Sequence, residues 1–461
     1  MESLVKVHVN TGFRRLLYLV SPNETSFRTL EEVPDYLTEA IPFLLAMVLI
    51  ETIVLVCQGK QTPRINDGVN SVACGLISLF HSLLFRGTEL VGFMWMYNRY
   101  NIVTLPWDNP MTWVLCLLGV DLCYYFVHRY GHEMNIMWAW HQTHHSTEDY
   151  NLTAGFRQPA VHRYMMWVFY LPLALVMPPA IFQVHIQFNL IYQFMVHTEV
   201  IKSLGPLEWI LSTPSHHRVH HGRNPYCIDK NYGGVFIIWD RLFGTFTAER
   251  EDEKVVYGLV HPLNSWDPLF AQFGHLQYMW KTFKQMDGLS NKLFVIWKGP
   301  GWGPGKPRLG LPEDIPQVKA PITKYDSGLP LWGNLYVIVH FGVILVGFID
   351  LTQQSKVIPA IYTVYCILYI MLSLTAFGAL YDHKNYGPLL EFGRCLLFLL
   401  VQQMLPVPLL LFSQILQWLH IASACFWGYM CIQQYSNSVK TKASQSVDST
   451  PQTTSCERIR L

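Results

Sequence analysis

Histidines in three short groups are the residues of this chain best suited to bind metal. Twelve of its 19 histidines lie between positions 128 and 221, spaced HxxxH once and HxxHH twice: His128 and His132; His141, His144 and His145; His217, His220 and His221. Residues i, i+3 and i+4 share a helix face, so each HxxHH group predicts three imidazoles directed toward one point. Eight nitrogens exceed the four ligands of a tetrahedral zinc ion. They favour two metal ions with positions open to a small molecule.

The recurrence of HxxHH argues against coincidence. From 19 histidines in 461 residues, chance would give about 0.03 copies, and the chain has two. The alternative interpretation is the histidine tract of a metal-storage or transport protein, such as a zinc transporter. Those tracts are low-complexity loops, whereas Trp138 and Trp140 lie among these histidines and apolar segments adjoin them. We therefore favour a catalytic metal centre and keep the transporter as the non-enzyme alternative.

Iron is the metal that the chemistry favours. Imidazole binds iron, zinc and copper, but zinc has no redox chemistry, and the HExxH pattern of zinc proteases is absent because no histidine stands three residues after Glu133. A pair of iron ions can activate O₂, which suits an unreactive C–H bond of a lipid. The sequence therefore predicts an O₂-dependent di-iron enzyme.

Further polar residues accompany the histidine groups. His185, Asn189, Gln193 and His197 are spaced by four along an apolar segment, and polar groups at membrane depth usually face a functional interior. We expect His197 to be a ninth ligand, with Gln193 as a ligand or supporting group; the alternative is that they only satisfy internal hydrogen bonds. Two carboxylates are catalytic candidates, Asp121 and Glu133. Asp121 is expected to accept the free ring N–H of a ligand histidine, the alternative being an ordinary buried polar contact. Glu133 is expected to bridge metals, orient a ligand or bind a cofactor amine, unless it is an ordinary solvated carboxylate.

Composition places these groups in a membrane protein. The chain is 51% hydrophobic and 14% charged, against about 25% charged residues in soluble domains. A net charge of +1 argues against nucleic acid as a partner. The ten cysteines are scattered without a CxxC pair and are expected to be reduced.

Apolar runs predict an all-α, polytopic membrane helical bundle, since a spanning helix needs about 20 apolar residues. We expect an N-terminal segment (1–39), a membrane-embedded catalytic domain (40–330), C-terminal transmembrane helices (331–435) and a disordered tail (436–461). The expected apolar segments are Ala40–Cys57, Val72–Tyr97, Met111–Val127, a hairpin of Met165–Ile181 and Phe182–Val200, Leu331–Leu351, Val357–Leu380, Cys395–Phe412 and Ile415–Cys431. Lys60 and Arg64 after the first span suggest that this loop is cytosolic, which would place the histidine site on the cytosolic side.

The motifs together resemble the fatty acid hydroxylase superfamily, which includes sterol desaturases and sphingolipid hydroxylases. The resemblance covers about 121–246 and includes the three histidine groups, Thr213–Pro225, the run Asn231-Tyr232-Gly233-Gly234 and the run Trp239–Thr245. Within the superfamily the chain is most similar to the branch that cleaves alkylglycerol ethers, through His132–Trp138, Gln142–Leu152, Gly205–Ile210 and the C-terminal spans from about Leu331.

That resemblance implies an endoplasmic reticulum membrane enzyme that cleaves the ether bond of alkylglycerols with O₂, two irons and tetrahydrobiopterin. It implies metal binding by the eight motif histidines and a requirement for Glu133, and it assigns no residue to the pterin. The enzyme alternative is a sterol or sphingolipid hydroxylase or desaturase supplied with electrons by a cytochrome.

Overall fold

The structure is a computed structural model, and it describes residues 7–84, 88–354, 357–404 and 413–448. The described residues form helices joined by loops, and the only β pairings among them are two isolated bridges. The helices are α1 (Val9–Leu16), α2 (Pro22–Thr25), η1 (Leu30–Glu32), α3 (Tyr36–Cys57), α4 (Ile65–Leu84), α5 (Thr88–Tyr100), α6 (Pro110–Glu133), α7 (Asn135–His145), η2 (Leu152–Phe156), α8 (His162–Ala174), α9 (Pro179–Met195), η3 (Gly205–Trp209), α10 (Pro214–His221), η4 (Pro225–Cys227), α11 (Ile238–Phe243), α12 (Pro268–Gln285), α13 (Leu289–Trp297), η5 (Pro312–Asp314), α14 (Leu331–Gln354), α15 (Ala360–Tyr381), α16 (Gly387–Met404) and α17 (Ser413–Asp448).

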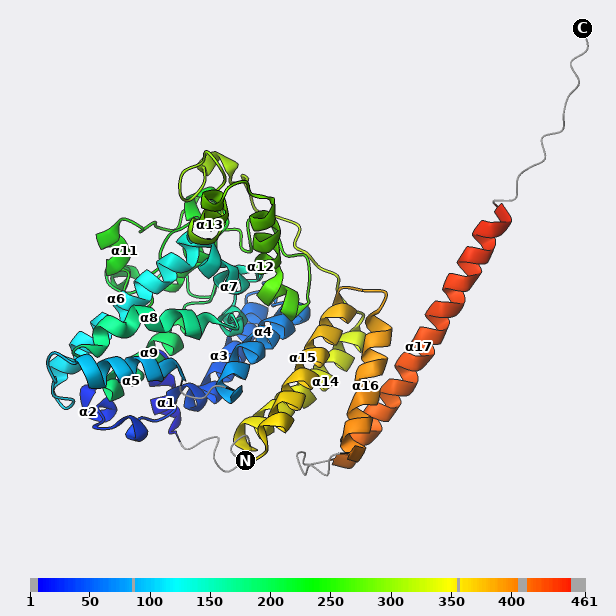
Figure 1. Ribbon diagram of the computed structural model, residues 1–461, viewed down its shortest axis with the longest axis horizontal. Coiled ribbons are helices and arrows are strands. Elements are labelled where there is room, and N and C mark those ends of the chain that lie inside the picture. Colours follow the sequence, from blue (N-terminus) through cyan, green and yellow to red (C-terminus); the bar gives the residue numbers. More distant parts are fainter. Residues whose placement is uncertain (1–6, 85–87, 355–356, 405–412, 449–461) are drawn as a thin grey trace, which may run out of the picture.

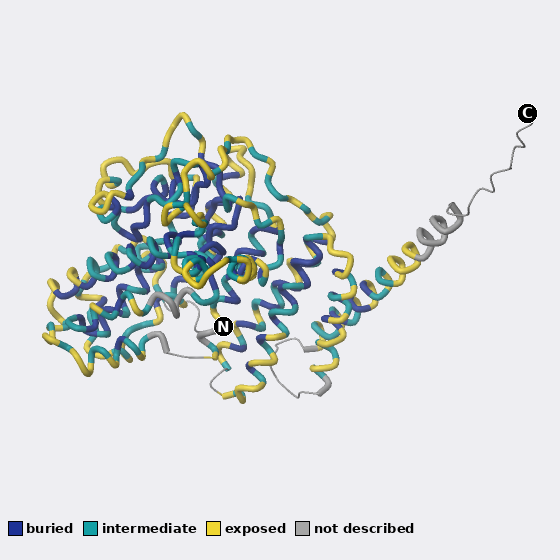
Figure 2. Tube along the Cα trace, turned by 45° about the horizontal axis from the view of Figure 1, so that its top comes forward, coloured by how far each residue is buried: buried dark blue, intermediate teal, exposed yellow. Residues whose placement is uncertain are grey.

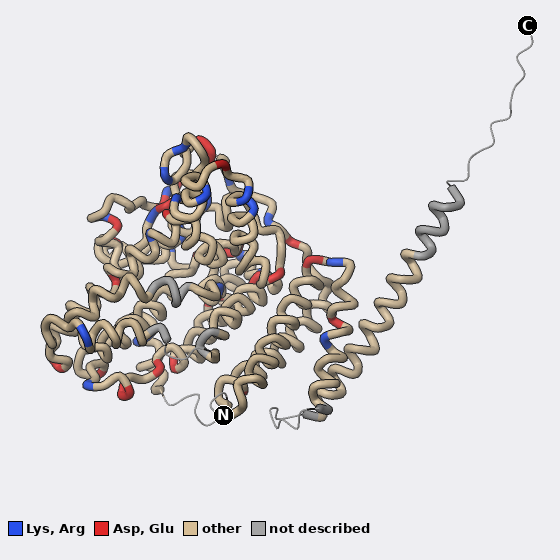
Figure 3. Tube along the Cα trace, in the orientation of Figure 1, with Lys and Arg blue, Asp and Glu red and all other residues tan. Residues whose placement is uncertain are grey.

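Five helices within the described residues are long and apolar enough to cross a membrane: Leu30–Cys57, Pro110–Glu133, Leu331–Gln354, Ala360–Tyr381 and Gln414–Ser438. Large apolar side chains such as Leu49 on α3 and Val346 on α14 are exposed, as lipid-facing positions would be. Charged residues are sparse along α14–α17 (Figure 3). The predicted all-α polytopic bundle is therefore confirmed.

Capping residues in the sequence set where these helices begin. Asp35 caps α3, its carboxylate accepting a hydrogen bond from the Thr38 amide at 3.1 Å. Asn109 caps α6 in the same way, and Pro110 follows at the first helical position, where a proline has no hydrogen bond to lose. The position at which α6 begins fixes the direction in which His128 and His132 point from its C-terminal end.

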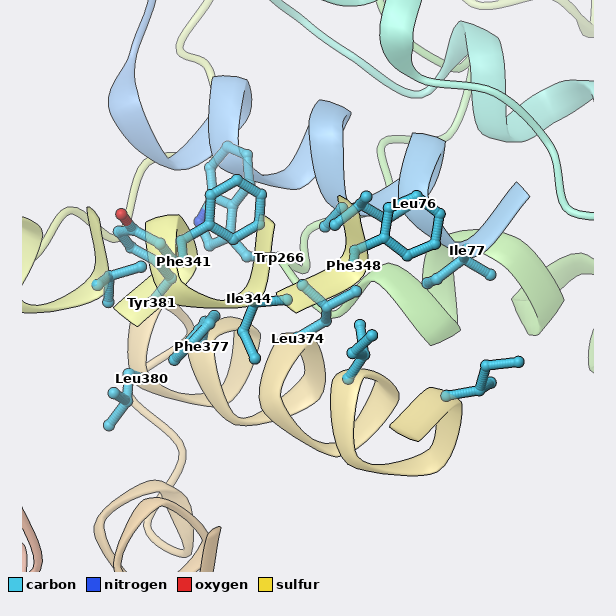
Figure 4. Close-up of a cluster of buried hydrophobic side chains, with 14 of the residues drawn as sticks. Leu76, Ile77, Trp266, Phe341, Ile344, Phe348, Leu374, Phe377, Leu380 and Tyr381 are labelled. Carbon is cyan, nitrogen blue, oxygen red and sulfur yellow. The ribbon is translucent and has the colours of Figure 1, made fainter. Parts of the chain in front are cut away.

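The helices form two packed groups (Figure 1). The larger group holds α1–α13, with α6, α8 and α9 near its centre, and α14–α17 lie beside it, α17 standing outermost. A buried cluster joins the groups by packing Leu76 and Ile77 of α4 against Phe348 of α14 and Phe377 of α15 (Figure 4). Buried segments are concentrated inside the larger group, with exposed loops around its rim (Figure 2).

Two expected segments differ from the observed helices. The run Val72–Tyr97 was predicted as one span, but its described residues belong to two helices, α4 and α5, and residues 85–87 between them lie outside the described residues. Helix α17 continues to Asp448, so helix occupies the first half of the tail predicted to be disordered. Residues 449–461 of that tail, and the end of the expected span Cys395–Phe412, lie outside the described residues.

Candidate metal centre

Three helices deliver the histidine motifs to one place. The last turns of α6 carry His128 and His132, the last turns of α7 carry the second motif, and the eight-residue helix α10 ends on the third. His197 follows the last turn of α9. All nine rings are buried. The extended backbone of Met134 ends α6 and lets α7 fold back against it, so two motifs that are adjacent in sequence can face each other.

The nine histidines predicted as ligands gather into two groups. In each group one nitrogen per ring lies within 4.8 Å of the others. The two groups adjoin, since the rings of His145 and His221 stack with centroids 4.3 Å apart. The first group is His128, His132, His141, His145 and His220; the second is His144, His197, His217 and His221.

Each HxxHH motif was predicted to direct its three imidazoles toward one point, and this prediction is wrong. His144 of the second motif joins the second group, while His220 of the third motif joins the first. Successive residues of a helix are rotated by about 100°, so positions i+3 and i+4 diverge by that angle around the axis. Residues i and i+4 therefore serve one group, and i+3 reaches across to the other.

Distances between ring nitrogens fit shared metal ions. In the first group the Nε2 atom of His141 lies 3.1 Å from Nε2 of His128 and 3.1 Å from Nε2 of His145. In the second group the Nε2 atoms of His217 and His197 are 3.0 Å apart. Two nitrogens bound at right angles to one ion at about 2.1 Å would be about 3.0 Å apart. The spacing thus suits adjacent ligands of an ion.

The opposite ring nitrogens fix the tautomers. Backbone carbonyl oxygens lie 2.7–3.1 Å from the Nδ1 atoms of four ligands, pairing His128 with Tyr232, His144 with Arg157, His197 with Gln193 and His220 with Lys230. Because a carbonyl only accepts, each Nδ1 carries the proton, and Nε2 of the neutral ring is an unprotonated lone pair.

The unprotonated Nε2 atoms show whether these residues suit a metal ion. The Nε2 atoms of His144 and His197 are 3.1 Å apart, yet neither can donate to the other, and a cation between them would make the contact favourable. The buried Nε2 atoms of His132 and His220 have no hydrogen-bond partner. Donor type, burial and orientation all fit metal binding.

Burial also keeps these rings uncharged. Desolvation, followed by repulsion from neighbouring histidines, lowers the pKa well below its usual 6.5 for His141, His145, His217, His220 and His221. A metal ligand must be a neutral imidazole. At neutral pH the cluster is therefore in the protonation state that binds cations.

Asp121 has a different place from the expected one. Its carboxylate accepts hydrogen bonds from the Val235 and Phe236 amides at 2.7 and 2.9 Å and from the Trp239 indole at 3.0 Å. The Tyr232 carbonyl, rather than Asp121, pairs with His128 Nδ1. A carboxylate buried inside α6 is most stable with several donors around it, and the 232–239 segment supplies them. Asp121 therefore anchors the segment whose Tyr232 carbonyl pairs with His128 Nδ1.

Glu133 is held by two guanidinium groups. Arg129 Nε donates to one carboxylate oxygen at 2.7 Å, and Arg308 Nη1 donates to the other at 3.0 Å. Glu133 belongs to neither histidine group. Its two oxygens are thus engaged by cations, and Arg308 ties the Gly- and Pro-rich stretch 299–310 to the end of α6.

The polar residues along α9 and just after it have different partners. Asn189 donates to Asp121 at 2.7 Å, Gln193 donates to Asn189 at 2.5 Å, and only His197 reaches a histidine group. His185 points elsewhere, its Nδ1 lying 2.7 Å from the hydroxyl of Tyr18.

Sequence reasoning missed three supporting residues. Asp240 accepts from the Tyr232 and Gly233 amides at 2.8 and 2.7 Å, which fixes the loop whose carbonyls orient His128 and His220. The motif Asn231–Gly234 with Trp239-Asp240 was the available signal. Arg157 forms a buried ion pair with Asp67 at 2.8 Å, and Arg308 pairs with Glu133 across 175 residues of sequence. No local pattern marks either of these two pairs.

Comparison with known proteins agrees with this architecture. The family model "Fatty acid hydroxylase" matches residues 113–245, and "Alkylglycerol monooxygenase C-terminal domain" matches residues 333–414. The first match contains all nine histidines. Residues 113–245 therefore form a fatty acid hydroxylase domain within the helical membrane bundle, as the motifs predicted.

Relatives define the family within that class. An alkylglycerol monooxygenase of Xenopus tropicalis is 50% identical over 86% of this chain and 89% of its own length, and that of Homo sapiens is 47% identical over 95% and 98%. Methylsterol monooxygenase 1 of Rattus norvegicus is 23% identical over 46% of the chain and 71% of its own length. The chain belongs to the alkylglycerol monooxygenase family and is a monooxygenase. No solved structure matches it.

Proposed function

We propose that this chain is a di-iron enzyme that cleaves the ether bond of alkylglycerols with O₂, taking electrons from tetrahydrobiopterin. The observation that carries the proposal is the pair of adjoining histidine groups, with buried Nε2 lone pairs directed at one another. The resemblance to alkylglycerol monooxygenases over nearly the whole chain supports the substrate class.

The overall reaction balances as a monooxygenation. One oxygen atom is inserted into a C–H bond of the ether carbon of the alkyl chain, giving a hydroxyl group, and the other oxygen atom leaves as water with two electrons from the pterin and two protons. The resulting hemiacetal separates into a fatty aldehyde and glycerol. Two bound iron ions would supply the activation of O₂ that this C–H bond requires.

The chain's own residues position the reactants. Nine histidines would hold the ions, and backbone carbonyls such as those of Tyr232 and Lys230 keep the ligand rings oriented. Burial excludes bulk water, which protects reactive species. The apolar helices around the site suit an alkyl chain, and placing the ether carbon near the ions would provide much of the selectivity.

The pterin has no assigned residues. Glu133, one candidate for pairing with a cofactor amine, already has both oxygens engaged by Arg129 and Arg308. The family resemblance alone supports tetrahydrobiopterin as the electron donor.

The proposed location is the endoplasmic reticulum membrane, with the site facing the cytosol. Arg64, in the loop whose positive charge suggests the cytosolic side, donates to Asp149 at 2.8 Å. Asp149 follows the second histidine motif by four residues, so the loop and the site lie on the same side of the molecule.

The deciding experiment measures fatty aldehyde released from an alkylglycerol by membranes containing the full chain. We expect release that needs both O₂ and tetrahydrobiopterin. Release with a reductase and cytochrome instead of the pterin would favour the sterol- or sphingolipid-hydroxylase alternative. Zinc in the purified protein with no oxygen uptake would favour the transporter.

A further inference from the structure

Two stacked tyrosines extend away from the second histidine group. The Tyr150 ring centroid lies 5.3 Å from that of His221 and 5.8 Å from that of His197. Tyr150 also stacks on Tyr257, with centroids 4.7 Å apart and 14° between the ring planes. Both tyrosines are buried, so their rings contact protein rather than water. Near-parallel rings at this distance allow an electron to pass between them.

The backbone fixes the outer tyrosine to the metal-binding helix. Tyr257 forms an isolated antiparallel bridge with Gly222, the residue after His221, and the Arg223 amide donates to the Val256 carbonyl at 2.8 Å. A Cβ atom on Gly222 would lie 2.6 Å from Cys227 Sγ, so glycine is what permits this close approach. The tyrosine pair is thus held at a constant distance from the ligands.

The two phenol groups differ in what can take their proton. Tyr150 donates to the Val196 carbonyl oxygen at 3.0 Å, whereas Tyr257 donates to a carboxylate oxygen of Glu199 at 3.0 Å. Loss of an electron makes a phenol strongly acidic. A backbone carbonyl cannot keep the released proton, but a carboxylate can, and Glu199 is exposed. An oxidised phenol is therefore more stable at Tyr257 than at Tyr150.

A tyrosine beside the first group lacks this arrangement. The Tyr232 ring centroid lies 5.3 Å from that of His132, but its buried hydroxyl has no hydrogen-bond partner. With no acceptor for its proton, Tyr232 is a poor site for oxidation. Proximity to the histidines alone does not create the arrangement seen at Tyr257.

We propose that Tyr150 and Tyr257 form an electron-transfer path that reduces the oxidised metal centre when no lipid is present to be oxidised. One electron passes from Tyr150 to the centre, and Tyr257 replaces it. The Tyr257 proton moves to Glu199, leaving a neutral tyrosyl radical, which a thiol or ascorbate at the surface then reduces by one electron. The path rests on the proposed di-iron function and would protect the ligand histidines from oxidation.

Electron paramagnetic resonance on the full-length protein tests the path. Iron-loaded, reduced protein is mixed with O₂ without lipid and frozen, while iron oxidation and oxygen uptake are measured on the same sample. We expect a tyrosyl radical whose signal narrows when the protein contains ring-deuterated tyrosine. Tyr257→Phe keeps the stacked ring but removes the ionisable hydroxyl, and the radical should be lost.

A matched control is Tyr226→Phe. Tyr226 packs against the same buried cluster, but its hydroxyl donates to the Glu253 carbonyl at 3.4 Å. This variant should keep the radical at the wild-type yield. Glu199→Gln, which removes the proton acceptor, should lower the yield. Peptide mass mapping after repeated exposure to O₂ should show more oxidised histidine in Tyr257→Phe than in the control.

The outcomes separate this inference from the function on which it rests. Iron oxidation without a tyrosyl radical, or an undiminished radical in Tyr257→Phe, would overturn the electron path and leave the di-iron function standing. Reduced iron that does not react with O₂ would overturn both.

Discussion

Replacing Asp121 by asparagine tests how the metal centre is oriented from outside its ligands. One Asp121 oxygen accepts from Asn189 and the Val235 amide, both at 2.7 Å. The other oxygen accepts from the Phe236 amide and the Trp239 indole, at 2.9 and 3.0 Å. An asparagine amide has one accepting oxygen. Whichever way it turns, two donors lose their acceptor and face an NH₂ group.

The cost can be worked from these contacts. A hydrogen bond to a charged acceptor contributes about 1.5–3 kcal/mol, so losing two costs about 3–6 kcal/mol before the donor–donor repulsion is added. The loss falls on the segment that carries the Tyr232 carbonyl to His128. Mutation of groups that orient metal ligands typically weakens metal affinity by about 10–100-fold, and we expect Asp121→Asn to fall in that range.

The assay compares iron retained per chain after challenge with a chelator, together with the thermal transition. Asp108→Asn is the matched control, because Asp108 is exposed just before α6. Asp121→Asn should release iron at a lower chelator concentration and melt earlier than the control. Equal iron retention and equal melting in the two variants would refute the reasoning, because the 232–239 segment would then not depend on this carboxylate.

Three further outcomes are expected. His197→Ala leaves three histidines in the second group and should reduce iron from two ions per chain toward one, as measured by metal analysis. His261→Ala, at an exposed histidine, should leave the iron content unchanged. Two ions retained in His197→Ala would exclude His197 as a ligand. Arg308→Ala should lower aldehyde release without loss of iron and be partly rescued by Arg308→Lys, because Glu133 loses its clamp; full activity in Arg308→Ala would show that the clamp is dispensable. The metal-free protein should be most stable above about pH 6.5. Below that pH the histidines of the unfolded chain take up protons, whereas the buried histidines of the folded protein, whose pKa is lowered, do not. A thermal transition that rises as the pH falls would contradict this.

Much of the fold was predictable because spans and ligand motifs are local patterns. Apolar runs indicated the spanning helices, and the i, i+3, i+4 spacing marked all eight motif histidines before any geometry was known. His197 stood out because a histidine four residues after Gln193 on an apolar segment is costly unless it has a partner.

What sequence could not provide depends on relations between distant segments. The exchange of His144 and His220 between the two groups follows from where three helix axes cross. The carbonyls of Tyr232 and Lys230 are backbone atoms and leave no side-chain signature. Arg308 reaches Glu133 only after the chain between them has folded, so neither its partner nor its role is visible in its neighbours.

The most direct test of the central claim is the metal content and metal environment of the purified full-length protein, measured by elemental analysis and iron X-ray absorption. We expect two irons per chain, each bound mainly by imidazole nitrogens, with a second iron detectable near the first. One zinc ion per chain with four closed ligands, or irons without a metal neighbour, would contradict a two-ion centre built from these nine histidines.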